Sequence, residues 1–276
     1  MRPSTEQRVW GLLGAAAAAW FAIWMLFVPD LVPKYFAWDV HPRAAQVFIG
    51  GGYIFRTFFF LNVAFEGNWL RLRWLVWGNL AFTGTLLTAT YWHLDQFNWD
   101  ILHQTPLAHI WIVLYILEPV AMIFLLPRGI LRAEPERTGG PLHPLFRKFL
   151  IGVTAILLTN GLLILANPGF AAKRWPWELN ELDSRISAAW FLGWSVWAGT
   201  MALAVDWDEI RRAAQLFILC GAALFITSLL NLGAFLTTRN TISGYLGGLA
   251  VLTVLMAVGY VVQERRRPTP YVGLAP

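Results

Sequence analysis

Long apolar segments recur along the whole chain and are separated by short polar connections. A surface helix of a soluble protein shows a polar face, and most of these segments show none. In an α-helix, about 20 apolar residues span the roughly 30 Å hydrocarbon core of a bilayer. Eight segments have this character, near residues 9–28, 45–65, 74–92, 107–126, 149–166, 186–205, 213–236 and 244–262. The pattern predicts an all-α integral membrane protein with about eight transmembrane helices.

Composition supports a membrane environment. The 276 residues are 57% hydrophobic and only 13% charged, whereas soluble domains devote about a quarter of their residues to charge. The net charge of +5 does not indicate nucleic-acid binding, because no basic stripe with interleaved aromatic residues lies on a polar face. The expected partner is the lipid bilayer.

The distribution of Lys and Arg predicts how the chain is oriented. If the N-terminus is cytoplasmic, 14 of the 21 basic residues fall in inner connections, six fall in outer ones, and Arg56 lies within a span. Because cytoplasmic loops carry the excess of basic residues, both ends of the chain are expected on the cytoplasmic side. Arginine outnumbers lysine 18 to 3, which is typical of GC-rich bacterial genomes, so we expect the inner membrane of a bacterium.

Two matches at nearly one offset predict an internal duplication. Trp38-Asp39-Val40 aligns with Trp177-Glu178-Leu179 at an offset of 139, and residues 93–97 align with 231–235 at an offset of 138. Each half would hold four spans, so the halves would be parallel and related by a pseudo-two-fold axis along the membrane normal. The expected units are a first four-helix repeat at 1–127, a cytoplasmic linker at 128–148, a second repeat at 149–263 and a cytoplasmic tail at 264–276.

Arg56 and Glu118 are the most informative polar residues, because each is the lone charge of an otherwise apolar span. At 1.5 Å per residue, both lie about 16–18 Å from the outer end of their helices, near the membrane midplane. A bare charge at this depth is costly, so we expect the two side chains to contact each other. The pair either lines a polar cavity for a ligand, ion or proton, or is a buried ion pair that fixes the packing of the first repeat.

A second polar group is expected at the outer ends of the spans. Its members are Asp39, His41, His93, Asp95, His103 and His109. Three interpretations are open: a hydrogen-bonding turn at the membrane surface, a ligand or substrate site, or a metal or tetrapyrrole held by His93 and His109. The spacing matches no dedicated metal motif, and the sequence does not identify a cofactor.

The two long outer connections are rich in aromatic residues, including Trp38, Trp175 and Trp177. Because tryptophan favours the headgroup region, these three side chains are expected at the outer membrane interface. Gly50-Gly51-Gly52 heads the second span without the strand and helix context of a phosphate loop, and it predicts a close approach of helices.

Two short motifs resemble those of an uncharacterised group of bacterial multi-span membrane proteins. They are Trp-Pro-Trp-x-Leu at residues 175–179 and His-x-Asp-x-Phe at 93–97. The resemblance covers most of the chain, through both expected repeats. It implies membership of a family and, because no activity is attached to that group, no particular function.

Two classes of function follow from these features. The chain has none of the usual enzyme signatures: no Gly-x-Ser-x-Gly, His-Glu-x-x-His or Walker sequence. We expect a non-catalytic membrane protein that binds or transports a small or lipidic ligand, or that serves as a subunit of a membrane complex. The alternative is a membrane enzyme, or a metal- or tetrapyrrole-binding protein, that uses the outer-face His and Asp residues.

Overall fold

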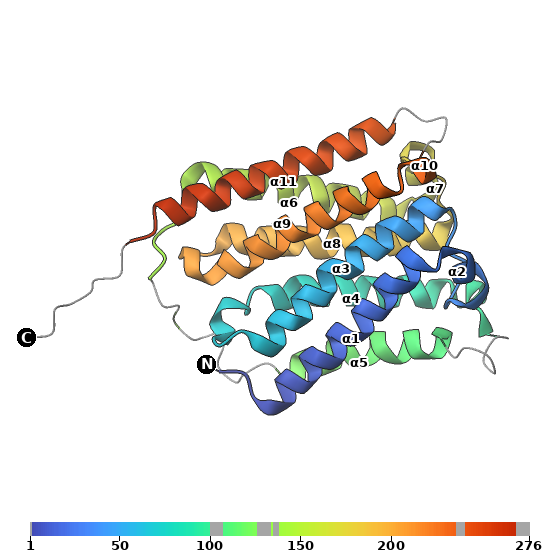
Figure 1. Cartoon of the computed structure of the whole chain (residues 1–276), viewed down its shortest axis with the longest axis horizontal. Coiled ribbons are helices and arrows are strands. Elements are labelled where there is room, and N and C mark those ends of the chain that lie inside the picture. The colour runs from blue at the N-terminus through green and yellow to red at the C-terminus, as the bar shows by residue number, and fades with distance from the viewer. Residues whose placement is uncertain (1, 100–106, 126–133, 135–137, 236–240, 269–276) are drawn as a thin grey trace, which may run out of the picture.

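The computed structural model describes residues 2–99, 107–125, 134, 138–235 and 241–268 as a bundle of long helices (Figure 1). The long helices are α1 (Thr5–Phe27), α3 (Arg43–Phe65), α4 (Leu75–Trp92), α5 (Leu107–Leu125), α6 (Pro144–Ala166), α8 (Glu181–Leu203), α9 (Trp207–Leu230) and α11 (Thr241–Arg265). Short helices occupy the connections: η1 (Pro29–Leu31), α2 (Val32–Tyr35), η2 (Trp69–Arg71), η3 (Leu94–Gln96), α7 (Pro168–Arg174) and α10 (Leu232–Phe235). The described residues form no β-strand, only two isolated bridges.

Seven of the described helices, all of the long ones except α4, are long and apolar enough to cross a membrane. They indicate a multi-pass helical membrane protein. Helix α4 is shorter, with 18 residues, and it carries polar side chains that lower its mean hydropathy. Three of these, Asn79, Thr83 and Thr90, are buried inside the bundle rather than turned to its surface.

All eight long helices run between the same two ends of the bundle (Figure 1). We call them the linker end, where α1 begins and α11 ends, and the arm end, where α2, α7 and α10 lie. The central helices are α3, α4, α8 and α9, and α3 packs on α9 while α4 packs on α8. Each has a peripheral neighbour: α1 on α3, α5 on α4, α6 on α8 and α11 on α9.

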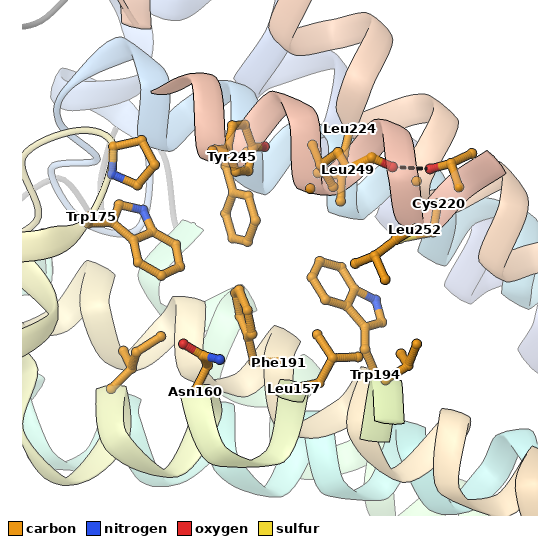
Figure 2. A pocket seen from close by; sticks show the side chains of 18 of the residues that line it. Leu157, Asn160, Trp175, Phe191, Trp194, Cys220, Leu224, Tyr245, Leu249 and Leu252 are labelled. Carbon is orange, nitrogen blue, oxygen red and sulfur yellow. Dashed lines mark hydrogen bonds between the residues drawn. The ribbon is translucent and has the colours of Figure 1, made fainter. Parts of the chain in front are cut away.

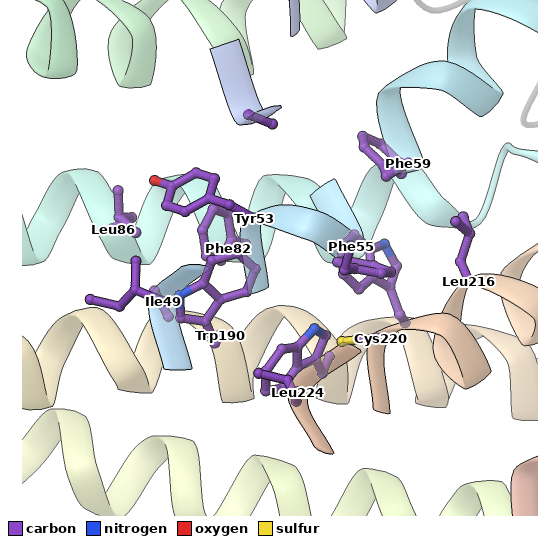
Figure 3. Close-up of a cluster of buried hydrophobic side chains, with 14 of the residues drawn as sticks. Ile49, Tyr53, Phe55, Phe59, Phe82, Leu86, Trp190, Leu216, Cys220 and Leu224 are labelled. Atoms are coloured by element: carbon purple, nitrogen blue, oxygen red, sulfur yellow. The ribbon is translucent and has the colours of Figure 1, made fainter. Parts of the chain in front are cut away.

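Aromatic side chains fill the centre of the bundle. Figure 3 shows Tyr53 of α3 beside Phe82 of α4 and Trp190 of α8. Phe55 of α3 packs on Trp197 of α8, with ring centroids 4.7 Å apart. The ring centroids of Phe82 and Trp190 are 4.3 Å apart. Such pairs add roughly 0.5–1.5 kcal/mol beyond the area they bury. The peripheral helices instead expose large apolar side chains, such as Phe124 on α5 and Val254 on α11, as a lipid-facing surface does.

The glycines at the head of α3 allow the expected close approach of helices. A Cβ atom added at Gly50 would lie 2.8 Å from Leu26 of α1, one at Gly51 would lie 2.9 Å from Leu224 of α9, and one at Gly52 would lie 2.8 Å from Trp190 of α8. Three neighbours therefore pack on three consecutive positions. Only hydrogen is small enough at these positions, because an added carbon at such distances overpacks the core.

Ion pairs tie the two halves together at the linker end. The guanidinium of Arg73 donates to Glu209 at the start of α9, and the indole Nε1 of Trp74 donates to the same carboxylate at 2.9 Å. Arg212 of α9 donates to Glu66, which follows α3, at 2.8 Å. The connection between α3 and α4 is thus fastened to the first turns of α9.

The expected position of the seventh span is wrong by about one and a half turns, since α9 is Trp207–Leu230 rather than 213–236. Asp206 caps the helix, and its side chain and that of Glu209 form a capping box. Negative charges in the first turn stabilise the N-terminus of a helix. They also lower the local hydrophobicity, so the start of this span was expected further along the chain.

The segment expected to be a linker is partly built into the second half. Helix α6 begins at Pro144, so residues 144–148 are helical. Ahead of it, the backbone N–H groups of Gly139 and Gly140 donate to Asp206 at 3.1 and 3.0 Å, and the N–H of His143 donates to Gln263 at 2.7 Å.

Trp38 and Trp177 lie at the arm end but do not face the surroundings of the bundle, because both indoles are buried with 1% and 0% of their surface exposed. Trp38 packs on Phe97, and its Nε1 donates to Asp183 of α8 at 2.9 Å. Trp177 packs on Phe235. Trp175 is half-buried and lies edge-on to Trp177. All three indoles therefore take part in packing within the protein at the arm end.

Candidate functional site

The expected contact between Arg56 and Glu118 is confirmed. A guanidinium nitrogen of Arg56 on α3 donates to Oε1 of Glu118 on α5. The side chain of Arg56 is 2% exposed and that of Glu118 is 11% exposed. Removing two charges from solvent is expensive, and close contact between them offsets much of that cost.

Asn79 of α4 completes this polar cluster. Its amide oxygen accepts from Arg56 at 2.8 Å, and its amide nitrogen donates to Glu118 Oε1 at 2.6 Å. Three helices therefore meet at one carboxylate oxygen. In the sequence, Asn79 is one amide inside a mostly apolar segment, and its place beside Arg56 depends on how α4 packs.

Aromatic rings confine the guanidinium of Arg56. Its Cζ atom lies 4.5 Å from the ring centroid of Phe82 and 5.1 Å from that of Phe60. A cation over a ring face gains about 2 kcal/mol when desolvated, although less at exposed sites. Arg56 is held in place by both its hydrogen bonds and these rings.

A cavity of about 380 Å³ adjoins the pair and is lined by α1, α3 and α5. We call it the first-half cavity. Besides Arg56 and Glu118, its polar lining residues are Tyr53 and Tyr115, whose hydroxyl oxygens are 2.5 Å apart. The sequence analysis missed both tyrosines, since an aromatic residue in a span does not reveal where its hydroxyl points. One signal was present: each tyrosine precedes a charged residue by three positions and so shares its helix face.

A larger cavity of about 660 Å³ lies between α6, α8, α9 and α11 and is mostly apolar. We call it the second-half cavity. Figure 2 shows Leu157 of α6 and Phe191 of α8 on one side of it, and Tyr245 and Leu249 of α11 on the other. Among the residues that the structure describes, no charged side chain lines its deep part, while Arg174, Thr241 and Ser243 line its arm end.

The two cavities are lined by residues at equivalent positions. Tyr53, Arg56, Tyr115 and Glu118 line the first, and the residues 138 positions later line the second: Phe191, Trp194, Thr253 and Met256. In the first helix of each half, Trp10, Gly14, Ala18 and Phe21 correspond at an offset of 139 to Phe149, Val153, Leu157 and Asn160. The polar cluster of the first half is thus replaced by an apolar wall in the second.

The outer-face residues do not converge on one centre. Asp39 and His41 contact each other at 2.6 Å and are exposed, and His109 lies edge-on to Trp99. Asp95 is exposed in η3, while His103 lies outside the described residues. In the described part of the chain, no group of three His, Cys, Asp or Glu side chains is arranged to hold a metal ion.

His93 instead joins the two halves at the arm end. Its ring is 6% exposed; Arg185 of α8 donates to Nε2, and the Gln96 side-chain amide lies 2.9 Å from Nδ1. The aligned residue Asn231 plays the corresponding role, because its amide oxygen accepts from Arg43 of α3 at 3.0 Å. Burial, and then the charge of Arg185, lower the pKa of His93. The imidazole ring is therefore neutral, and Nε2 is free to accept a hydrogen bond from Arg185.

Comparison with family models, with curated proteins and with solved structures finds no match to the chain. The fold and the two cavities define the class of protein: a multi-pass helical membrane protein with cavities among its apolar helices.

Replacing Arg56 alone is expected to be strongly destabilising. The Arg56→Ala variant strands a buried carboxylate, and breaking such a pair typically costs about 3–5 kcal/mol. The double variant Arg56→Leu, Glu118→Leu should cost less than either single leucine change, because it removes both charges. Thermal unfolding of the purified variants in lipid nanodiscs measures the order of their stabilities. A double variant as unstable as the sum of the singles would contradict a stabilising ion pair.

The contact of His93 predicts a pH dependence of stability. Because the folded state lowers the pKa of His93, the unfolded state binds more protons as pH falls below about 6.5, and the free energy of unfolding falls with it. The charged groups around the ring are Arg185, Glu181 and Asp95. In His93→Asn, an amide oxygen can accept from Arg185 without titrating. Its melting temperature should fall less than that of the wild type between pH 7.5 and 5.5; equal losses would contradict this role.

Proposed function

We propose that the protein is a non-catalytic, multi-pass membrane protein that binds a lipidic molecule. The observation that carries this proposal is the second-half cavity, which lies among helices that are themselves apolar enough to lie in a bilayer. Its volume of about 660 Å³ is within the range of about 300–1,000 Å³ that is usual for ligand pockets.

The lining of this cavity favours an acyl or isoprenoid chain. Its deep part is built from Leu, Val, Phe, Trp and Met side chains, which offer a chain apolar contacts and few hydrogen bonds. Polar groups gather at the arm end, where Arg174 and Thr241 would meet a headgroup. An amphiphile matches this division better than a compact polar solute does.

Glycines on α11 create the space. Gly244 and Gly248 line the cavity one turn apart, and no atom lies within 4 Å of a Cβ added at either position. A Cβ added at the neighbouring Gly247 also has no atom within 4 Å, but Gly247 does not line the cavity. The chain thus offers a blocking position and a matched control on one helix.

Filling the cavity should displace the ligand. We expect Gly248→Phe to reduce the amount of tightly bound lipid that copurifies with the protein, and Gly247→Phe to leave it unchanged, because only the first ring enters the cavity. Lipid extraction from the purified variants, with quantification by mass spectrometry per mole of protein, measures the effect. Equal lipid content in both variants would contradict a lipid site in this cavity.

All eight long helices, α4 included, are proposed to span the inner membrane of a bacterium. What supports eight crossings is that α1 begins and α11 ends at the same end of the bundle, which requires an even number (Figure 1). The linker end is proposed to be cytoplasmic, because it carries the larger share of Lys and Arg.

Reporter fusions test this topology. Fusions at Gly139 and after Arg267 should both report a cytoplasmic position, since both sites lie at the linker end next to basic segments. A fusion at Gly169, in the arm connection, serves as the control and should report a periplasmic position. A periplasmic signal at either of the first two sites would overturn the orientation.

We also propose that the two halves, residues 1–127 and 149–263, are related by duplication. Three observations support it. The packing α1–α3, α4–α5 and α3–α9 corresponds to α6–α8, α9–α11 and α8–α4. The pair Trp38–Phe97, at 5.6 Å between ring centroids, corresponds to Trp177–Phe235 at 5.4 Å. The equivalent lining of the two cavities is the third.

A further inference from the structure

The carboxylate of Glu118 keeps one oxygen available. Both hydrogen bonds that it receives from the described residues end on Oε1, from Arg56 and from Asn79. No described residue donates to Oε2. Glu118 lines the first-half cavity and its side chain remains 11% exposed, so this wall presents a hydrogen-bond acceptor.

The tyrosine pair keeps one donor available. Two hydroxyl groups carry two protons, and the bond between Tyr53 and Tyr115 uses one of them. Within the described part of the chain, neither hydroxyl has a second side-chain partner. Since both tyrosines line the first-half cavity, the same wall presents one free O–H donor.

The spacing of donor and acceptor fits a single bridging oxygen. Tyr115 and Glu118 lie three residues apart on α5, and residues at this spacing are neighbours on one helix face, with Cβ atoms about 5–6 Å apart. An O–H···O hydrogen bond is about 2.7 Å long, so one ligand oxygen that makes two such bonds covers a similar span. That oxygen must donate to the carboxylate and accept from the tyrosine.

We propose that the first-half cavity binds a lipophilic alcohol or phenol by its hydroxyl group. The hydroxyl donates to Oε2 of Glu118 and accepts from the tyrosine pair. The hydrocarbon part lies against the apolar lining of α1 and α5, which includes Leu13, Ala17 and Leu117. The volume of about 380 Å³ suits one such molecule. Arg56 donates to Glu118 and to Asn79 and lies against the ring of Phe82, so it positions the carboxylate.

This site is separate from the lipid site proposed in the second half. An anionic ligand is disfavoured by the carboxylate, and a ligand that only accepts hydrogen bonds leaves Oε2 unused. Comparing the affinities of an alcohol and its methyl ether therefore distinguishes the proposal from these alternatives. The ether can accept a hydrogen bond from the tyrosine pair, but it has no proton to donate to Glu118.

The test uses tritiated farnesol, an isoprenoid alcohol, and the full chain in phosphatidylcholine nanodiscs, whose lipid has no hydroxyl group. Unlabelled farnesol and farnesyl methyl ether compete for the bound label. The wild type should prefer the alcohol about 10-fold or more, because a hydrogen bond to a charged group contributes roughly 1.5–3 kcal/mol.

In Glu118→Gln this preference should fall to about one. Arg56 and Asn79 both donate to the retained oxygen, so the new amide nitrogen occupies the position of Oε2 and donates to alcohol and ether alike. In Tyr53→Phe, Tyr115→Phe both ligands should weaken while the preference for the alcohol remains. The two variants give opposite signatures, and the tyrosine variant still decides the question if Glu118→Gln does not fold.

Three outcomes would overturn the proposal: equal affinity of the wild type for alcohol and ether, a preference that survives Glu118→Gln, or a preference that the tyrosine variant removes. Gly248→Phe is the control for the other cavity and should bind farnesol as the wild type does. If Gly248→Phe alone abolishes binding, the alcohol occupies the second-half cavity. Failure of the lipid proposal itself shows separately, as unchanged lipid copurification in that same variant.

Discussion

A carboxylate and a guanidinium in the middle of apolar helices constrain how the first half of this protein can pack. Glu118 on α5 must meet Arg56 on α3, and the Asn79 amide on α4 must lie between them, because no water is available in a bilayer core to replace any of the three. Dispersion between apolar side chains is nearly as favourable with lipid as with another helix, so it selects no single arrangement. The polar cluster selects a single arrangement, since only one register of the three helices satisfies its hydrogen bonds.

The described residues of the second half form no such cluster. Trp194 and Met256 stand 138 positions after Arg56 and Glu118, and an apolar cavity lies between α6 and α11. The polar contacts of α11 gather near the linker end, where Gln215 donates to Tyr260 at 2.7 Å and Arg211 donates to Glu264 at 2.6 Å. Toward the arm end, the hydroxyl of Tyr245 lies 3.3 Å from that of Ser228. Within α11 itself only Met256 and Gln263 are fully buried. One half is therefore held by a buried polar cluster, and the other leaves room for a molecule.

Much of this architecture could be predicted from the sequence, because a lone charge and a long apolar run have few solutions in a membrane. The spans and the Arg56–Glu118 contact follow from desolvation alone. The burial of Trp38 and Trp177 could not be predicted, because the indole ring is equally suited to a headgroup layer and to a protein core; for Trp38 the core supplies a hydrogen-bond acceptor, Asp183. The cavities could not be predicted, since each depends on side chains that fail to meet across helices far apart in the sequence. The spare hydroxyl of the tyrosine pair is equally a property of packing.

The alternation of the four central helices has a consequence for movement. Since α3 packs on α9 and α4 on α8, the boundary between the halves is itself a tightly packed core, with Gly51 against Leu224 and the ring of Phe82 against Trp190. Rocking one half against the other, the motion by which many transporters alternate access between two sides of a membrane, would break these contacts together. Helix α11, by contrast, packs mainly on α9. Exchange of a bound lipid with the surrounding leaflet by a sideways displacement of α11 disturbs that packing, the aromatic contacts of Tyr245 with Trp177 and Phe235, and the polar contacts near the linker end. A lateral path within the plane of the membrane is therefore less costly for this fold than passage from one aqueous side to the other.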